Sequence, residues 1–214
     1  MARTDPSVAW AIQKLQDYEE IQRSGSPYKP EPYISTCCKC NQLIDAIKTR
    51  RSIRWYENRP VDDETVLRII ESVNWAPSSC NRQPAKVFVT NNPELSRRCL
   101  ELCSGSSGFS DYVPLFLIFA SDPRAYEMPR EVMMPYIDVS LGVQNCILVA
   151  HSLGISITLL TWAQSSKQQD KQLRRLLLIP DSCQIIVNAT GGYPAFGAKV
   201  PARKTIEQTI VLIK

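Results

Sequence analysis

Residues 137–154 read IDVSLGVQNCILVAHSLG, a long run in which Asp138 carries the only formal charge. The length and apolar character predict a helix over 137–153, and Gly154 stands where a C-terminal capping glycine is expected. A helix with so few polar positions is buried on nearly every side, either at the centre of a large domain or against a partner. The rest of the main domain is therefore expected to pack around this segment.

Apolar runs on both sides of the 137–154 segment predict the strands of a sheet. Residues 113–121 (VPLFLIFAS) form a continuous apolar run, which is typical of a central strand covered on both faces. Helical stretches alternate with the strands, which indicates an α/β or α+β domain with helices on a mixed sheet. Four further runs complete a predicted set of five strands: 86–90 (KVFVT), 155–160 (ISITLL), 184–190 (QIIVNAT) and 209–213 (TIVLI).

Local capping signals predict the helices around this sheet. Asn41 is placed to cap a short helix in which Leu43, Ile44 and Ile47 face inward. The remaining predictions are a helix after the acidic residues 62–64, one that begins at 92–93, and an amphipathic one near 171–178.

The first forty residues are expected to be an extension of a main domain that spans 41–214. A helix is predicted over 7–21, with Asp5 placed as its cap. Residues 24–33 (SGSPYKPEPY) contain three prolines, so an extended or irregular connection is expected there.

Composition narrows the class of protein. The 214 residues carry a formal net charge of +4, which is modest for a nucleic-acid-binding protein. Its basic residues are clustered, around 48–54 and 199–204, which favours an anionic small-molecule ligand. No uninterrupted apolar run reaches the roughly 18 to 20 residues of a membrane span, and the first thirty residues do not resemble a signal peptide. A cytoplasmic location is expected.

The eight cysteines are scattered, unlike the regular spacing of a small disulfide-rich domain. Cys37, Cys38 and Cys40 lie close together and leave three interpretations open: a metal site, redox-active thiols, or small residues in a docking segment. Adjacent cysteines rarely both reach one metal, so no metal site is predicted.

Residues 50–54 read RRSIR and place two guanidinium groups and a hydroxyl, from Arg50, Ser52 and Arg54, at regular spacing after a helix. Guanidinium groups match phosphate oxygens in bidentate geometry, so the pattern fits an anionic ligand. The same residues also fit the ordinary role of cations that offset the dipole at a helix end. The motif alone leaves both interpretations open.

Two further motifs are also ambiguous when taken singly. Residues 76–84 (APSSCNRQP) are expected to form a polar turn. Asn81 and Gln83 offer paired donors and acceptors that suit the edge of a heterocycle. The alternative is that the turn only links a helix to a strand. Residues 191–195 (GGYPA) permit positive φ and a close backbone approach, and Arg203 returns positive charge after them.

The order and spacing of these motifs change the interpretation. RRSIR, PSSCNRQP, a buried helix ending at Gly154, and GGYPA with Arg203 together resemble the nitroreductase family of FMN enzymes over residues 41–214. The resemblance implies the family's three-layer α+β fold, with a mixed central sheet flanked by helices. It also implies a homodimer, with much of the interface formed by the 137–154 helix and FMN held between the subunits.

The resemblance assigns cofactor-binding roles to residues of all three motifs. Those implied for the FMN phosphate and ribityl chain are Arg50, Arg51, Ser52, Arg54 and Arg203. Those implied for the isoalloxazine, contributed by the other subunit, are Pro77, Ser78, Ser79, Asn81 and Gln83. Thr161 and Gly192 complete the implied set.

The implied enzyme moves a hydride or electron pair between NAD(P)H and a small, flat, electron-poor substrate (a nitroaromatic, quinone or enone) by a ping-pong mechanism. The flavin carries the chemistry, so no side-chain nucleophile is required, and His151 is best explained by packing or by its place at a helix end.

Alternatives remain on the same scaffold: a specialised biosynthetic dehydrogenase, a reductive dehalogenase, a flavin-modifying enzyme, or a non-catalytic flavin-binding protein. Ala85 stands where the family often has an aromatic residue. Residues 161–163 (TWA) lack the glycine that many members have near flavin N5.

Overall fold

The computed structural model describes residues 6–24, 40–162 and 165–213. The chain divides into two compact units, Met1–Cys38 and Lys39–Lys214. Within the first unit, helix α1 spans Pro6–Ser24, a few residues more than the predicted 7–21. The predicted cap Asp5 lies outside the described residues.

The second unit is built on a four-stranded sheet in the order β1-β2-β4-β3. Its strands are β1 (Ala85–Thr90), β2 (Leu115–Ser121), β3 (Ser156–Leu160) and β4 (Gln184–Gly192), which match four of the predicted runs. Every pairing is antiparallel, so the predicted mixed sheet is wrong for the single chain.

The fifth predicted strand, at 209–213, is also wrong. These residues are exposed and form a turn followed by irregular backbone. A strand needs a neighbouring backbone to pair with, and among the described residues no strand pairs with 209–213.

Five helices of the second unit lie among the described residues. Two of their caps follow the sequence signals, whereas Asn41, predicted to cap α2, lies inside that helix, which begins at Cys40. Asp62 accepts a hydrogen bond from the Thr65 amide, and Asn92 accepts one from the Leu95 amide. The helices are α2 (Cys40–Thr49), α3 (Asp63–Glu71), α4 (Pro93–Glu101), α5 (Met134–Ser152) and α6 (Lys167–Leu176). Short 3-10 turns lie at Ser72–Trp75 (η1), Ser79–Asn81 (η2), Pro123–Ala125 (η3) and Pro129–Glu131 (η4).

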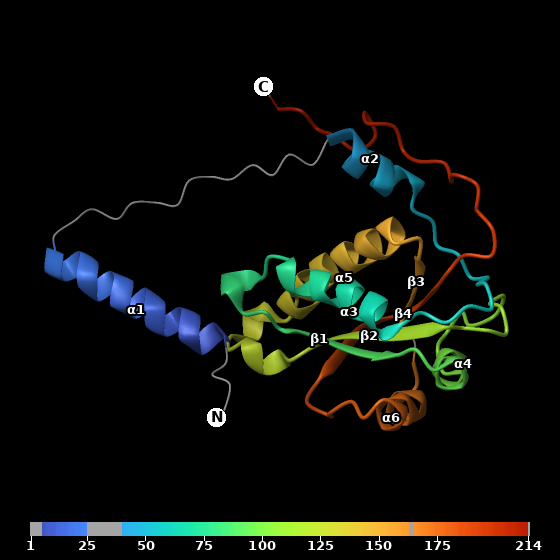
Figure 1. Ribbon diagram of the computed structural model, residues 1–214, viewed down its shortest axis with the longest axis horizontal. Helices are drawn as coiled ribbons and strands as arrows, with labels where there is room; N and C mark the ends of the chain where they lie inside the picture. The colour runs from blue at the N-terminus through green and yellow to red at the C-terminus, as the bar shows by residue number, and fades with distance from the viewer. Residues whose placement is uncertain (1–5, 25–39, 163–164, 214) are drawn as a thin grey trace. The chain divides into compact units, whose positions relative to one another are not determined.

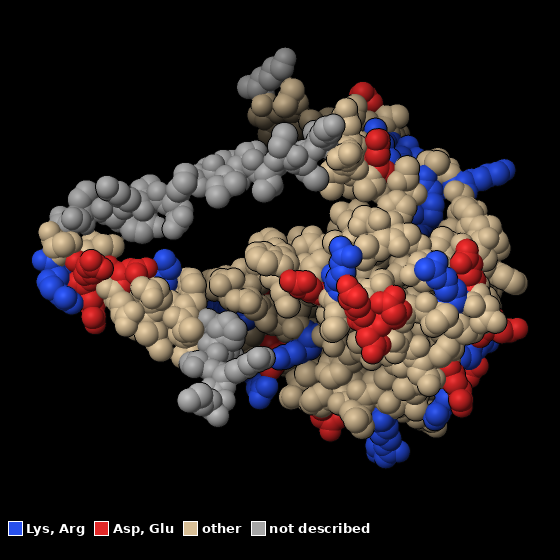
Figure 2. Space-filling view, in the orientation of Figure 1, with Lys and Arg blue, Asp and Glu red and all other residues tan. Residues whose placement is uncertain are grey.

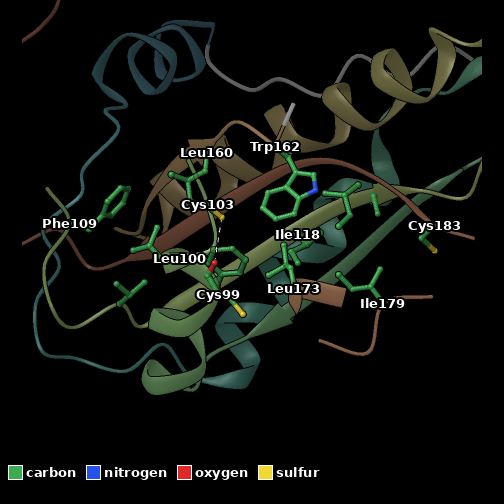
Figure 3. Packing of buried hydrophobic residues seen from close by; sticks show 14 of the residues in the cluster. Cys99, Leu100, Cys103, Phe109, Ile118, Leu160, Trp162, Leu173, Ile179 and Cys183 are labelled. Atoms are coloured by element: carbon green, nitrogen blue, oxygen red, sulfur yellow. Dashed lines mark hydrogen bonds between the residues drawn. The ribbon is translucent and has the colours of Figure 1, made fainter. Parts of the chain in front are cut away.

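Helices cover both faces of the sheet (Figure 1), with α3 and α5 on one face and α4 and α6 on the other. Strand β2 is buried along its whole length, as its continuous apolar sequence predicted. Its side chains alternate between the two layers, because successive residues of a strand point to opposite faces. Leu115 and Leu117 belong to the core under α3 and α5. Ile118 packs with Leu100 and Leu173 in the core under α4 and α6 (Figure 3). The three-layer α+β fold is confirmed.

Helix α5 is the central helix that the sequence predicted, and Gly154 follows it with a φ of 77°. The segment Pro129–Ser152 is long and apolar enough to cross a membrane by length and composition. In the structure, however, Val139, Val143 and Cys146 of α5 are buried in the core against the sheet. Its opposite side leaves Ile137 48% and Leu141 42% exposed.

Helix α2 departs from the prediction in the direction of its apolar face. Leu43, Ile44 and Ile47 were expected to face inward, but they are 48%, 38% and 50% exposed. The helical spacing of these three residues does place them on one apolar face of α2, as predicted. Among the described residues of the second unit, no element covers that face fully.

Candidate cofactor-binding site

The RRSIR segment runs extended from the end of α2 and is held against β3 by two buried hydroxyls. Ser156 Oγ accepts a hydrogen bond from the Ile53 amide at 3.1 Å and donates one to the Arg51 carbonyl at 2.9 Å. Thr158 Oγ1 donates to the Ile53 carbonyl at 2.6 Å. These bonds fix the backbone of the segment, so its side chains start from defined positions.

The GGYPA motif lies beside the same segment. The Glu57 amide donates to the Tyr193 carbonyl at 2.8 Å, and the Ala195 amide donates to the Trp55 carbonyl at 3.0 Å. The first and third sequence motifs therefore meet in space. A cavity of about 250 Å³ opens where they meet, lined by Thr49, Arg51, Ile53, His151, Gly154, Ile155, Ser156, Pro194, Phe196, Gly197 and Ala198.

Positive charge is concentrated beside this cavity. Figure 2 shows basic side chains grouped near the end of α2. Burial lowers the pKa of the half-buried Arg50, and the charges of Arg51 and Arg203 lower it further. Arg50 Nη1 also donates to Ser52 Oγ at 3.3 Å. Arg203 thus lies within electrostatic range of Arg50, and the like charges of Arg50, Arg51 and Arg203 would favour a nearby anion.

Arg51 supplies a polar atom that lacks an acceptor. Its Nη1 donates to the carbonyls of Lys48 and Arg50, each at 2.6 Å. Its Nε is buried and has no partner among the described residues. A buried donor without an acceptor is costly. Because Arg51 lines the cavity, this side of the site fits the phosphate group of a cofactor.

His151 forms part of the cavity wall, a place that the sequence did not reveal. Its Nε2 lies 3.0 Å from Thr49 Oγ1 in a hydrogen bond. Burial lowers its pKa, and the charges of Arg50 and Arg51 lower it further. His151 is therefore neutral near pH 7 and adds polarity, rather than charge, to the cavity.

Three predicted site residues lie elsewhere. The Arg54 guanidinium lies over the Phe109 ring, 5.8 Å from its centroid. Thr161 is exposed just after β3. Gly192 is buried in β4 without a positive φ, and an added Cβ would meet Pro114 and Tyr56. The expected positive φ is therefore absent at Gly192, and the close approach of neighbouring groups to its backbone is the reason that a glycine is required there.

The second motif forms a strained turn between η1 and β1. Three non-glycine residues have positive φ there: Cys80 (52°), Asn81 (54°) and Gln83 (49°). The Gln83 amide donates to Ser78 Oγ at 3.0 Å, which closes the turn on itself. Pro77, Asn81 and Gln83 are exposed, while Ser78 and Ser79 are half-buried. Such conformations are found most often at functional sites.

The strained turn and the basic cavity lie at opposite ends of α5. The Ser79 amide bonds Asp138 near the start of the helix, whereas Thr49 bonds His151 near its end. At 1.5 Å per residue, these two positions are about 20 Å apart. One chain therefore does not bring the second motif to the other two.

The cysteine cluster lies mostly outside the described residues. Cys40 begins α2, whereas Cys37 and Cys38 are not described. Within the described ranges, no three or more His, Cys, Asp or Glu residues are grouped so that they could hold a metal ion. Ala163, in the loop after β3, also lies outside the described residues.

Comparisons with known proteins give matches in both sequence and fold. The sequence model of the Nitroreductase family matches residues 47–112. A protein of Methanothermobacter thermautotrophicus named as an NADH dehydrogenase/NAD(P)H nitroreductase is 30% identical over 72% of this chain and 78% of its own length. Iodotyrosine deiodinase 1 of Rattus norvegicus is 21% identical over 94% of this chain and 82% of its own length. A solved nitroreductase structure from Desulfovibrio desulfuricans, in complex with FMN, has the same fold, with a TM-score of 0.67. The two sequences are 24% identical, and the match covers 80% of this chain and 96% of that one.

Proposed function

The chain belongs to the nitroreductase family, and on this premise we propose that it is an FMN-dependent oxidoreductase that works as a homodimer. It transfers a hydride or electron pair between NAD(P)H and a small, flat, electron-poor acceptor such as a nitroaromatic, quinone or enone. The two substrates react in turn, by a ping-pong mechanism.

The observation that carries this proposal is the basic cavity where RRSIR meets GGYPA. Arg50, Arg51 and Arg203 supply the positive charge, and the buried Arg51 Nε lacks an acceptor. A phosphate dianion would relieve the repulsion among the three guanidinium groups and would satisfy charge-assisted hydrogen bonds. We assign Arg50, Arg51, Ser52 and Arg203 to the FMN phosphate and its ribityl chain.

The strained turn is assigned to the isoalloxazine, but in the partner subunit. Because it lies about 20 Å along α5 from the phosphate cavity of its own chain, a second copy is the natural source of the turn that completes each site. The exposed side chains of Asn81 and Gln83 would meet the polar edges of the ring. Thr161, exposed after β3, is assigned to the ring from the chain that holds the phosphate.

The homodimer is supported by apolar surface that the single chain leaves uncovered. Exposed apolar side chains on α2 and α5 and in the C-terminal segment form this surface: Leu43, Ile44, Ile47, Ile137, Leu141, Val200, Ile206, Ile210, Val211, Leu212 and Ile213. Exposed apolar patches of this kind mark interaction sites. The covering partner also explains why the predicted inward face of α2 is exposed.

The dimer has a direct test. The substitution Ile47→Asp places a charge on the exposed face of α2, and we expect it to yield monomers that have lost FMN. Leu67→Asp is the matched control, because Leu67 is 66% exposed on α3. Sedimentation velocity gives the mass. A dimeric Ile47→Asp variant with full FMN content would contradict the assigned interface.

When bound, FMN supplies the hydride and electron chemistry. The chain holds the phosphate, orients the ring and limits the access of water. The neutral His151 lies in the wall of the phosphate cavity and hydrogen-bonds Thr49, so we assign it to binding and not to proton transfer.

Turnover tests the enzyme activity. Purified dimer loaded with FMN should oxidise NADH or NADPH when menadione or a nitroaromatic is added. Initial rates at varied concentrations of both substrates should give the parallel lines of a ping-pong mechanism. A loaded protein that reduces none of these acceptors would refute the proposed substrate class and leave the cofactor assignment intact.

One observation favours a second candidate, a reductive dehalogenase. The match to the rat iodotyrosine deiodinase covers 94% of this chain, more than residues 41–214 can supply, so it extends into the first forty residues. Release of halide from a halogenated phenol or halotyrosine under reducing conditions would support this candidate. The absence of halide release, together with rapid quinone reduction, would favour the first proposal.

A further inference from the structure

Asp138 is the one charged residue in the apolar helix α5, and only 6% of it is exposed. A buried carboxylate is costly unless hydrogen bonds replace its water. The carboxylate lies in the second turn of α5, beyond the first turn in which the helix dipole acts most strongly, so its burial needs other partners.

The hydrogen bonds of this carboxylate come from two segments outside α5. The Ser79 amide donates to Asp138 Oδ2 at 3.0 Å, and the Tyr126 hydroxyl donates to the same oxygen at 2.8 Å. Burial raises the pKa of Tyr126, and the hydrogen bond to Asp138 and its charge raise it further. Tyr126 therefore stays protonated and remains a donor.

The other end of the strained turn is tied to the same neighbourhood. Arg82 Nη1 forms a 2.7 Å ion pair with Glu131 Oε1, and the Arg82 guanidinium lies over the Tyr126 ring, 5.5 Å from its centroid. Glu131 Oε2 in turn accepts the amides of residues 127 and 128. Asp138 of α5 thus holds the Ser79 end of the turn, and Glu131 in the segment between β2 and α5 holds the Arg82 end.

The turn needs these external bonds. Left-handed backbone at a non-glycine residue costs about 1 kcal/mol or more, and this turn contains three such residues. Its own hydrogen bonds close it locally, whereas the Ser79 amide fixes it to the core helix. An amide bond sets the position of the backbone itself, which a contact through a flexible side chain would not do.

We propose that Asp138 is a positioning residue for the reaction: by holding the Ser79 amide, with Tyr126 as its second donor, it sets the strained turn at the place where the turn meets the cofactor of the partner subunit. This inference rests on the proposed function. Asp138 itself touches neither cofactor nor substrate.

The test compares Asp138→Asn and Asp138→Ala with Asp170→Asn in the full-length dimer. Asp170 is the matched control because its carboxylate, like that of Asp138, accepts two hydrogen bonds, here from the side chains of Trp162 (Nε1, 3.2 Å) and Arg174 (Nε, 2.7 Å), on the opposite face of the sheet. The readouts are amide hydrogen exchange over residues 77–84, the visible circular dichroism of bound FMN, the melting temperature, and kcat and KM for NAD(P)H.

In Asp138→Asn we expect faster exchange over 77–84, an altered flavin dichroism band, and a kcat at least roughly tenfold lower with KM for NAD(P)H changed less. Asp138→Ala should be more affected, because Asn keeps one acceptor oxygen. If Asp138→Ala does not fold, Asp138→Asn decides the question. Asp170→Asn should lower the melting temperature without changing exchange at the turn or the flavin band.

An Asp138→Asn variant that changes only the melting temperature, as Asp170→Asn does, would overturn the positioning role. A protein that takes up no FMN would overturn the proposed function and this inference together. The two failures are distinguishable because the first is seen in a flavoprotein that still turns over.

Discussion

Removing Arg50 should weaken FMN binding without harming the fold of the apoprotein. The guanidinium is half-buried beside the cavity, where a charge-assisted hydrogen bond to phosphate is worth about 1.5–3 kcal/mol. Arg50→Ala should therefore raise the Kd for FMN roughly tenfold to a hundredfold. Arg203 is exposed, so Arg203→Ala should cost no more than about 1 kcal/mol, or roughly fivefold in Kd.

The sign of the effect on the apoprotein separates binding from structure. Without an anion, Arg50 is destabilised by burial and by the charges of Arg51 and Arg203. The apoprotein of Arg50→Ala should then melt at the wild-type temperature or above it, while the stabilisation by added FMN shrinks.

Fluorescence titration of FMN gives the Kd, and Lys204→Ala controls for the loss of one positive charge. We expect Lys204→Ala to bind FMN nearly as the wild type does, and the double variant Arg50→Ala/Arg203→Ala to lose FMN during purification. An unchanged Kd in the double variant would refute the phosphate assignment. A lower apoprotein melting temperature in Arg50→Ala with an unchanged Kd would make Arg50 structural.

Two further predictions concern stability. Gly192→Ala should lower the free energy of unfolding in urea by about 1–3 kcal/mol, since the new Cβ would lie 2.9 Å from Tyr56 Cδ1 and against Pro114. Gly197→Ala is the control and should have little effect, because Gly197 has open space beside it. Equal losses of stability in both variants would contradict the packing explanation. For His151, the pKa is lowered below 6.5 in the folded state, so the unfolded chain binds more protons and stability is lost as pH falls below 6.5. Unfolding of the apoprotein at about pH 7.5 and about pH 5.5 should show a smaller loss in His151→Gln than in the wild type; an identical loss would refute a lowered pKa.

Local chemistry made much of the fold predictable. Asp62 and Asn92 cap helices because their side chains satisfy free amides, and Gly154 ends α5 because its left-handed backbone favours glycine. These effects depend on neighbours in sequence alone. Three predictions of the fold were wrong: the mixed sheet, the inward face of α2 and the strand at 209–213. The last two concern exposed apolar residues that the proposed partner subunit would cover.

The site was less predictable because its geometry depends on contacts between distant segments. The sequence indicated a cluster of cations suited to an anion, but it did not reveal the anchoring hydroxyls of Ser156 and Thr158, which lie in an apolar strand. A polar residue inside an apolar run was the available signal, and Asp138 carried the same signal in α5. The role of Gly192 depended on Pro114 and Tyr56, which lie far from it in sequence.

The central claim is that this chain forms a flavin site that accepts electrons from a nicotinamide. The most direct measurement is the visible absorption spectrum of the purified protein, recorded anaerobically before and after NADH or NADPH is added. We predict a bound flavin spectrum that bleaches with NAD(P)H and returns when menadione is added. A colourless protein that takes up no FMN, or a bound flavin that neither nucleotide reduces, would contradict the claim.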